Sequence, residues 1–581
     1  MNKSDITIVS LLVALLIGWM YMSRVNAPPP GKQPVSPALS STNGPASSLP
    51  RDTALQAAPE SQPSAVTQAA VVAEPEETII LTNANVRLTL SSLNGGIVSA
   101  EFLKYRAERA PDSPPLVHDF RSQPALSFRG SVFPTNGGYR LLRNPTGNGA
   151  TVTATLSDGL TLQRALSLDD TYRVTSTDVF TNATKSAVNL PPYGLATGPM
   201  EVNDPKLRRA DLAFLGLDTL PAHGGEGVHY WMKSGLFSKS PLPPLFAAQA
   251  KDGTQMPLSV EYLSDTPVLW AAVKSRFFAQ ILYAGEMTAG CSLTAWRQNE
   301  PSRNAIITAV AASVLYPAAM VDAGASEVRE ASYYLGPKSY SLLKALGNRE
   351  DEVMDLGKWF GWIAKLMLPV LNGIHTVLPN YGIAIIALTV LVRLILWPLT
   401  VKSTQSMKKM QELQPLVTQL REKYKDKPQK MNQELMALYK EHKVNPMAGC
   451  LPMLLQLPVF IALFKVLQSA VELRFASFLW IKDLSEPEGL LAGVLPFSLS
   501  LNILPLVMTG LTVWQQKITP SGGDPQQQKM MMFMPLIFLF LFYNMASALV
   551  LYWTVSQALS IAQMVQQRKG KNLPAPAAGK K

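Results

Sequence analysis

Arg393 is the most unusual residue in the sequence, because it lies twelve residues into a long apolar stretch. An arginine at the centre of a membrane-spanning helix costs roughly 2.5–3.5 kcal/mol on insertion scales. Thr389, Trp397 and Thr400 lie four residues before it, four after and seven after, so they share its helical face. This spacing favours a wet cavity within the membrane; the alternatives are snorkelling of the side chain towards Lys402 or a helix–helix hydrogen bond.

Two other apolar stretches also carry polar side chains. Gln456 lies in one, while Trp553, Ser556, Ser560 and Gln563 are spaced 3, 4 and 3 residues apart in the last. A single serine or glutamine commonly serves only to pack helices together. A polar face on each of three stretches favours one shared hydrophilic site instead.

The sequence gives little support for nucleotide, metal, acid/base or disulfide chemistry. There is no G-x-x-x-x-G-K phosphate loop and no H-E-x-x-H metal motif, so nothing indicates ATP use or metal catalysis. His223 and His229 could form an acid/base pair, but no carboxylate or cysteine lies at a useful spacing, which favours two loop histidines. Cys291 and Cys450 are too few for a disulfide scaffold. We expect no cofactor and no enzymatic activity.

The apolar residues are clustered. The chain has 581 residues, 47% hydrophobic and only 16% charged, with a net charge of +11. Six apolar stretches predict six transmembrane helices, at residues 6–22, 381–401, 450–468, 490–514, 530–543 and 547–565. For residues 6–22 the alternative is a cleavable signal peptide, although Pro28 would follow the cleavage site and favours an uncleaved anchor. Residues 26–77 contain ten prolines and no aromatic residue, which is typical of a disordered tether.

Charge predicts the orientation of these helices. The segment Lys402–Lys443 carries ten basic and five acidic residues, and the tail after Val565 carries five basic residues and no acid. The loop Val471–Gly489 carries two basic and four acidic residues. Because cytoplasmic loops are enriched in lysine and arginine, we expect both termini in the cytoplasm. The middle of the chain would then lie outside, most simply in a periplasm.

The basic segment has its own apolar pattern. Two stripes at heptad spacing are separated by Asp426-Lys427-Pro428, and they predict an antiparallel helical hairpin. Pro415 should bend the first helix. The basic outer face either is simply solvated or docks on RNA or an acidic partner. The stripes comprise Met410, Leu413, Val417, Leu420 and Tyr424, then Met431, Leu435, Leu438 and His442.

The middle of the chain alternates apolar and polar residues. Val86–Leu90, Thr151–Leu156, Leu160–Leu168 and Tyr172–Phe180 show period two and are separated by turn residues. This pattern predicts an antiparallel β-sandwich. After it, an aromatic-rich segment predicts a helix lying in the membrane interface, which Pro369 should break.

These patterns together predict a polytopic α-helical membrane protein with an all-β domain. The expected boundaries are a transmembrane anchor 1–25, a linker 26–77, the β-sandwich domain 78–345, an interfacial helix 346–380, TM2 381–401, the hairpin 402–447, TM3 448–468, an external loop 469–489, TM4 490–515, a cytoplasmic loop 516–529, TM5 530–543, TM6 547–565 and a basic tail 566–581.

Several local motifs occur in a fixed order along the last third of the chain. The main ones are Leu391-Val392-Arg393, Trp397-Pro398-Leu399-Thr400, Lys443-Val444-Asn445-Pro446, Gly449-Cys450-Leu451-Pro452, Gln456-Leu457-Pro458, Leu479-Trp480-Ile481-Lys482-Asp483-Leu484 and Leu549-Val550-Leu551-Tyr552-Trp553. With these motifs, residues 357–567 resemble the YidC/Oxa/Alb family of membrane-protein insertases. Asn94-Gly95-Gly96 and Tyr334-Leu335-Gly336-Pro337 resemble the start and end of the large periplasmic domain of its Gram-negative members.

The resemblance implies a five-helix insertase core with a hydrophilic groove, and a periplasmic β-supersandwich similar to sugar mutarotases. Arg393 and Thr389 match the family's groove arginine and threonine. Tyr552 and Trp553 stand where the family often has two tyrosines, so one hydroxyl is lost. With the polar faces described above, the expected groove residues are Arg393, Thr389, Gln456, Tyr552, Trp553 and Ser556.

The implied function is insertion, folding and assembly of proteins in the bacterial inner membrane. Expected partners are nascent membrane proteins, the Sec translocon, the ribosome and the lipid bilayer, with no small-molecule substrate. The expected docking residues on the hairpin are Lys408, Lys409, Arg421, Lys423, Lys440 and Lys443. The rival hypothesis is a secondary transporter that binds an anionic solute at Arg393, although no internal repeat of spans is found.

Overall fold

The computed structural model describes residues 75–569, except 136, 202–213, 223–226, 232–258, 286, 299–305, 358, 426, 443, 445–450, 491–500 and 519–524. The described residues all belong to one compact unit, Val72–Lys581. The predicted N-terminal anchor, nearly all of the linker, His223, Cys450 and most of the basic tail lie outside the described residues.

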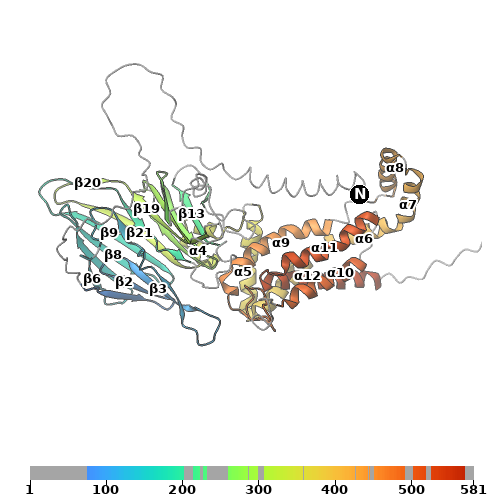
Figure 1. Ribbon diagram of the computed structural model, residues 1–581, viewed down its shortest axis with the longest axis horizontal. Helices are drawn as coiled ribbons and strands as arrows, with labels where there is room; N and C mark the ends of the chain where they lie inside the picture. Colours follow the sequence, from blue (N-terminus) through green and yellow to red (C-terminus); the bar gives the residue numbers. More distant parts are fainter. Residues whose placement is uncertain are drawn as a thin grey trace, which may run out of the picture. The chain divides into compact units, whose positions relative to one another are not determined.

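The first half of the described chain forms β-sheets in which every pairing is antiparallel, as predicted (Figure 1). The strands are β1 Thr78–Thr82, β2 Val86–Ser91, β3 Ile97–Arg106, β4 Pro115–Asp119, β5 Phe128–Arg129, β6 Arg140–Arg143, β7 Gly149–Thr155, β8 Leu160–Leu168, β9 Arg173–Asn182, β10 Val188–Leu190, β11 Tyr193–Ala196, β12 Met200–Glu201, β13 Gly216–Pro221, β14 His229–Tyr230, β15 Ser259–Ser264, β16 Val268–Lys274, β17 Phe278–Tyr283, β18 Gly290–Gln298, β19 Ile306–Tyr316, β20 Ala319–Val321 and β21 Ser326–Pro337. We call this region, Thr78–Pro337, the β domain.

Two large sheets dominate the β domain. One has nine strands in the order β14-β13-β16-β17-β21-β9-β8-β7-β6, and the other has six, in the order β15-β18-β19-β11-β5 with β12 also pairing with β19. A four-stranded sheet, β1-β2-β3-β4, and the pair β10-β20 complete it. The sandwich prediction is therefore confirmed. His229 belongs to the short strand β14, not to a loop as predicted.

Alternate side chains of a strand point into the core of the β domain, and β8 has one charged side chain at such an inward position. Alternate residues of β8 are buried, and Leu162 and Leu166 are apolar as expected. Between them the inward position is Arg164, which is fully buried. The free-energy cost of burying this charge is offset by Asp178, which lies opposite Arg164 on β9. The Asp178 carboxylate accepts two hydrogen bonds, each 2.7 Å, from Nε and Nη2 of Arg164.

A short helical region follows the β domain. It contains α4 Tyr340–Leu346, the 3₁₀ helix η2 Glu350–Met354 and α5 Gly361–Val377. The expected break at Pro369 is wrong, because α5 runs through it. A proline removes one backbone hydrogen bond, but α5 keeps a buried face, including Leu368 and Leu371, that holds it in place. Trp362, two-thirds exposed, lies away from that face.

The last third of the chain is helical (Figure 1). Two of its helices contain stretches long and apolar enough to cross a membrane, Tyr381–Val401 and Ser547–Gln566, and two shorter apolar helices are Gln456–Ser469 and Phe533–Phe542. These are found among the described residues only. The helices are α6 Tyr381–Glu412, α7 Gln414–Lys423, α8 Pro428–Glu441, α9 Leu451–Ser469, α10 Ile503–Ile518, α11 Pro525–Phe542 and α12 Ser547–Lys569.

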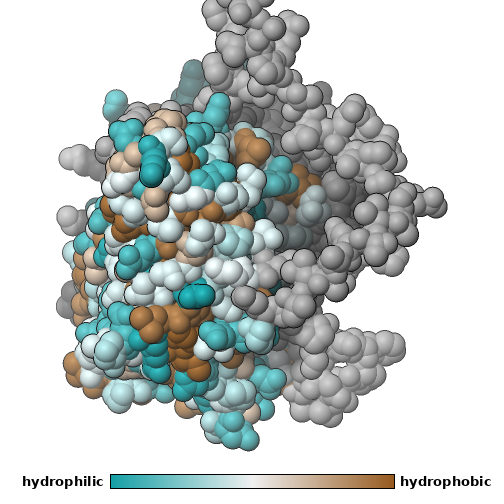
Figure 2. Space-filling model, turned by 90° about the vertical axis from the view of Figure 1, so that its left-hand side faces the viewer, coloured by the Kyte–Doolittle hydropathy of each residue, from teal (hydrophilic) through white to brown (hydrophobic). Residues whose placement is uncertain are grey.

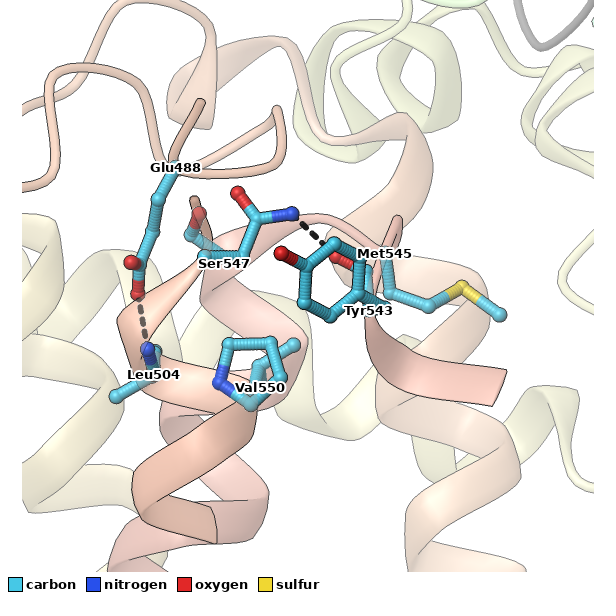
Figure 3. A pocket seen from close by; sticks show the side chains of 8 residues that line it. Glu488, Leu504, Tyr543, Met545, Ser547 and Val550 are labelled. Atoms are coloured by element: carbon cyan, nitrogen blue, oxygen red, sulfur yellow. Dashed lines mark hydrogen bonds between the residues drawn. The ribbon is translucent and has the colours of Figure 1, made fainter. Parts of the chain in front are cut away.

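The start of α10 differs from the prediction of a span from Leu490. Leu490 instead forms an isolated antiparallel bridge with Leu501. The helix begins at Ile503 because the Glu488 carboxylate accepts hydrogen bonds from the backbone N–H groups of Ile503, at 2.6 Å, and Leu504, at 2.8 Å. Those groups have no partner within the helix. Figure 3 shows Glu488 reaching over the end of the helix towards Leu504.

The predicted hairpin is present as α7 and α8. Leu413, Val417, Tyr439 and Val444 form a separate small core, against which Met410, Leu435 and Leu438 pack. α6 ends at Glu412, and α7 begins just before Pro415, which lies in its first turn. Pro415 thus produces a helix boundary rather than the predicted bend, since proline fits the first turn of a helix.

The surface of the β domain is mixed in character. Figure 2 shows a face on which hydrophilic and hydrophobic residues are interspersed. Its exposed large apolar residues come from separate strands, for example Val117 on β4, Leu142 on β6 and Met320 on β20.

On α6, by contrast, Val390, Leu391, Leu394 and Ile395 are exposed together, as expected for a helix that faces lipid.

Candidate functional site

Arg393 is held by one residue of a neighbouring helix. Its Nε donates to Ser556 Oγ at 3.0 Å, and its Nη2 donates to the same oxygen at 2.6 Å and to the Ser556 carbonyl oxygen at 2.8 Å. Arg393 belongs to α6 and Ser556 to α12. The arginine therefore makes the helix–helix hydrogen bond that was one of the sequence alternatives, and a backbone carbonyl absorbs part of its charge.

Gln456 of α9 joins the same cluster. Its Nε2 donates to Tyr552 Oη at 2.6 Å and to Ser556 Oγ at 3.2 Å. Ser556 is thus the shared acceptor for Arg393 and Gln456. We call Arg393, Gln456, Tyr552 and Ser556 the polar cluster. It connects α6, α9 and α12, which supplied the three polar faces noted in the sequence.

A second polar contact joins α6 and α12 further along. Gln563 Nε2 donates to Thr400 Oγ1 at 3.0 Å, and both side chains are buried. The Ser560 hydroxyl donates to the Ser556 carbonyl oxygen of the same helix at 2.9 Å. Residues Ser556, Ser560 and Gln563 therefore face α6 as a stripe. Their face continues back to Tyr552, four residues before Ser556.

Two of the predicted groove residues make no hydrogen bond to the polar cluster within the described part of the chain. Thr389 is buried, and its hydroxyl donates to the Ile385 carbonyl of its own helix at 2.6 Å. Trp553 packs among aromatic rings, with centroids 4.9 Å from Phe460 and 5.5 Å from Phe542. Its Nε1 is buried without a hydrogen-bond partner in the described part of the chain. Tyr552 rather than Trp553 therefore supplies the polar group on this helix.

Within the described residues, no acidic side chain pairs with Arg393. Among the residues that the structure describes, Arg393 forms no ion pair, and its Nη1 makes no hydrogen bond. The same described residues contain no group of three histidine, cysteine, aspartate or glutamate side chains that could hold a metal ion. The site can therefore offer a positive charge with free N–H donors to an incoming anionic group.

The pocket in Figure 3 lies elsewhere on α12. It is lined by Glu488, Asn502, Leu504, Pro505, Tyr543, Met545, Ser547 and Val550. Its polar groups are used to join helix ends, since Asn502 Nδ2 donates to the Tyr543 carbonyl at 2.7 Å. Val550 precedes Ser556 by six residues, or about 9 Å along the helix. We assign this pocket a structural role.

Three of the six predicted docking residues have exposed side chains. Lys423 and Lys440 are exposed on the hairpin, Lys409 is exposed in the last turn of α6, and Arg421 is partly buried. Lys423 also lies over the ring of Tyr424, with Nζ 5.5 Å from the ring centre. Lys443 lies outside the described residues, and the structure places Lys408 only by its backbone, on α6.

Comparison with known proteins identifies the family. The family model described as "YidC periplasmic domain" matches residues 78–370, just over half of the chain, and the model described as "60Kd inner membrane protein" matches residues 373–573. The chain belongs to the YidC family. The expected resemblance is confirmed, and the β domain corresponds to the family's periplasmic domain.

Two of the curated relatives that match are named "Membrane protein insertase YidC". The protein of Syntrophobacter fumaroxidans is 51% identical over 234 residues, covering 40% of this chain and 42% of the relative. That of Syntrophus aciditrophicus is 42% identical over 297 residues, covering 51% of each. The chain therefore spans about half the length of the curated relatives it matches.

Solved structures are more distant. The one titled "Active YidC insertase crystal structure with the first transmembrane domain resolved" is 17% identical, covers 85% of this chain and 94% of its own, and has a TM-score of 0.34. A putative aldose 1-epimerase from Escherichia coli covers 45% of this chain and 99% of its own, at 10% identity and a TM-score of 0.29. Since both TM-scores are below 0.5, the family assignment rests on the sequence matches.

Proposed function

We propose that this chain inserts, folds and assembles integral proteins of the inner membrane, alone or with the Sec translocon. The observation that carries the proposal is Arg393, held between α6 and α12 by Ser556 with no acidic partner among the described residues. The names of its relatives, insertases of the same family, agree with this function.

The mechanism follows from the cost of moving polar groups through lipid. A substrate segment that crosses hydrocarbon loses hydration at every polar group. A hydrophilic groove beside the polar cluster shortens that crossing, and Arg393 attracts acidic residues of the segment transiently. The substrate's own apolar helix then moves into lipid, and its burial there supplies the free energy without a nucleotide.

The proposed topology has six spans, with both chain termini in the cytoplasm and the β domain in the periplasm. α6, α9, α10, α11 and α12 are the five spans that follow the N-terminal anchor. The support is the charge of the connecting segments, which is basic in Lys402–Lys443 and acidic in Val471–Gly489. On this topology the α7–α8 hairpin and the basic tail face the ribosome, whose RNA is an anionic surface.

Reconstitution tests the function directly. The purified chain is placed in liposomes, and insertion of a small two-span protein is scored by protease protection of its translocated segment. We expect insertion well above that of empty liposomes. In parallel, uptake of labelled anionic solutes is measured. Uptake of a solute without insertion of the two-span protein would contradict the proposal and indicate a secondary transporter.

A further inference from the structure

A tight turn at Phe478–Ile481 exposes two large apolar side chains. Phe478 and Ile481 exchange both backbone hydrogen bonds, at 2.9 Å and 2.8 Å, so Leu479 and Trp480 form a two-residue turn. Leu479 is 74% exposed and Trp480 is 44% exposed. Ile481, at the base of the turn, is buried. The turn therefore presents Leu479 and Trp480 outwards; we call these two residues the tip.

The tip would be unfavourable in water. Leu479 has a φ of 51°, in the left-handed region where a leucine costs roughly 1–2 kcal/mol relative to its usual conformations. Turns of this kind commonly have glycine or asparagine at that position. The leucine side chain is also exposed, and an apolar environment around the tip would explain why an apolar side chain is kept at this strained position.

The structure places the tip beside the first residues of a candidate membrane span. Asn380 Oδ1 accepts hydrogen bonds from the N–H groups of Gly382 and Ile383, so it caps the start of α6. The same side chain donates from Nδ2 to the Ser477 carbonyl at 3.1 Å, directly before the turn. The ring of Phe478 lies against Gly382, where a Cβ atom would come within 2.1 Å of it.

The other side of the loop contacts the second candidate span. The Leu484 carbonyl accepts a hydrogen bond, 2.9 Å long, from the N–H of Ala548 in the first turn of α12. The loop that carries the tip is thus bonded to the N-terminal ends of both α6 and α12. The boundary between hydrocarbon and water lies near the ends of apolar spans, so the tip lies at that boundary.

We propose that the tip is a membrane anchor, in which Leu479 and Trp480 insert into the interfacial region of the leaflet where α6 and α12 begin. Ile383, which is exposed on the first turn of α6, connects the tip with the lipid-facing side of that helix. Tryptophan prefers this depth, and the exposed Lys482 reaches the phosphate groups. The partner is phospholipid. The proposal does not depend on insertase activity.

A fluorescent label at the tip tests this. Cys291 and Cys450 are replaced by alanine, Leu479→Cys is labelled with an environment-sensitive dye, and the full chain is reconstituted in phosphatidylcholine vesicles. The matched control is Met320→Cys on β20, whose side chain is 65% exposed and also apolar. We expect lipids with a nitroxide on the upper acyl chain to quench residue 479 about three-fold more than residue 320, and aqueous iodide to quench it less.

Two results would overturn the anchor. Iodide quenching at residue 479 equal to that at residue 320 would place the tip in water. Quenching by neither reagent would mean that a protein surface, such as a second copy of the chain, covers it. Either result is independent of the insertion assay, which can succeed or fail separately.

A second variant tests how the tip is positioned. Gly382→Ala puts a methyl group into the Phe478 ring, so the tip should move and lipid quenching at residue 479 should fall towards the value at residue 320. Gly373→Ala on α5 is the matched control, because a Cβ there has no atom within 4 Å. Equal lipid quenching in the two variants would contradict the placement of the tip by Phe478.

Discussion

Arg393 keeps one nitrogen, Nη1, without a hydrogen bond in the described part of the chain, and its other contacts go to Ser556 alone. If its role is attraction to acidic substrate segments, Arg393→Lys should retain much activity, because lysine keeps the charge while losing the fork geometry. Arg393→Ala should slow insertion of substrates with acidic translocated tails and affect neutral tails less. The measurement is insertion of a panel of substrates with graded tail charge.

The control is protein abundance, because a purely structural arginine would give a different pattern. Loss of the bonds to Ser556 would then loosen α6 from α12, and all substrates would fail together. The panel is therefore run at matched protein levels. A uniform loss for Arg393→Ala would remove the electrostatic explanation and leave packing or hydration.

His118 on β4 should make the β domain sensitive to acid. Burial among aromatic rings, and secondarily the charge of Arg474, lowers its pKa to about 4. The unfolded value is about 6.5, so the stability that depends on neutral His118 is complete above pH 6.5 and is lost as the pH falls towards 4. The expected loss is about 3 kcal/mol. Hydrogen exchange of β3 and β4 amides in the full chain, corrected for intrinsic rates, measures it.

The matched variant is His118→Phe. Phe102 and Phe278 already surround the ring, with centroids 5.0 Å and 5.3 Å away, so a phenyl group fits the site. This variant cannot take up a proton, and its protection should change much less between pH 7 and pH 4.5. An identical pH dependence in both proteins would show that other groups control acid stability.

At the scale of elements, the α7–α8 hairpin has a core of its own, which allows its surface to be changed without unfolding it. Replacing the exposed Lys409, Lys423 and Lys440 with glutamine should weaken binding to ribosomes about ten-fold and reduce its salt dependence, since fewer phosphate contacts remain. Sedimentation with purified ribosomes over a salt series provides the measurement.

A second triple variant separates position from net charge. Thr418, Gln419 and Asn432 are also exposed on the hairpin. Changing all three to glutamate lowers the net charge by the same amount as the lysine variant. We expect a smaller loss of ribosome binding for it. Equal losses would mean that overall charge, not the named lysines, determines binding.

Local pattern predicted many elements but not the contacts between them. β8 spans Leu160–Leu168 and α12 begins at Ser547, as predicted, because periodicity and turn residues are local signals. The start of α10 was missed because its cap, Glu488, comes from a separate loop. In the candidate site, spacing grouped Trp553 with Ser556, although Tyr552 lies one helical turn away and makes the polar contact.

At the scale of the whole molecule, the proposed topology can be tested by labelling. Single cysteines are placed at the exposed positions Met320, Lys482 and Lys427 in a chain without Cys291 and Cys450. An impermeant thiol reagent added to intact spheroplasts should label the first two and not the third, because the proposed topology puts only the first two in the periplasm. Permeabilised cells provide the control for reactivity. Labelling at residue 427 from outside would invert the topology.

The length of α6 has a mechanical consequence. The helix continues from Lys402 to Glu412 beyond its candidate span, about 16 Å further, and carries the hairpin at its end. Pro398 lies within it and cannot donate to the carbonyl four residues earlier, so the helix lacks one backbone hydrogen bond there. A partner that binds the hairpin and pulls on it would therefore bend α6 most readily at Pro398, five residues from Arg393. The hairpin and the polar cluster are thus connected by a single helix, α6, which lacks a backbone hydrogen bond between them.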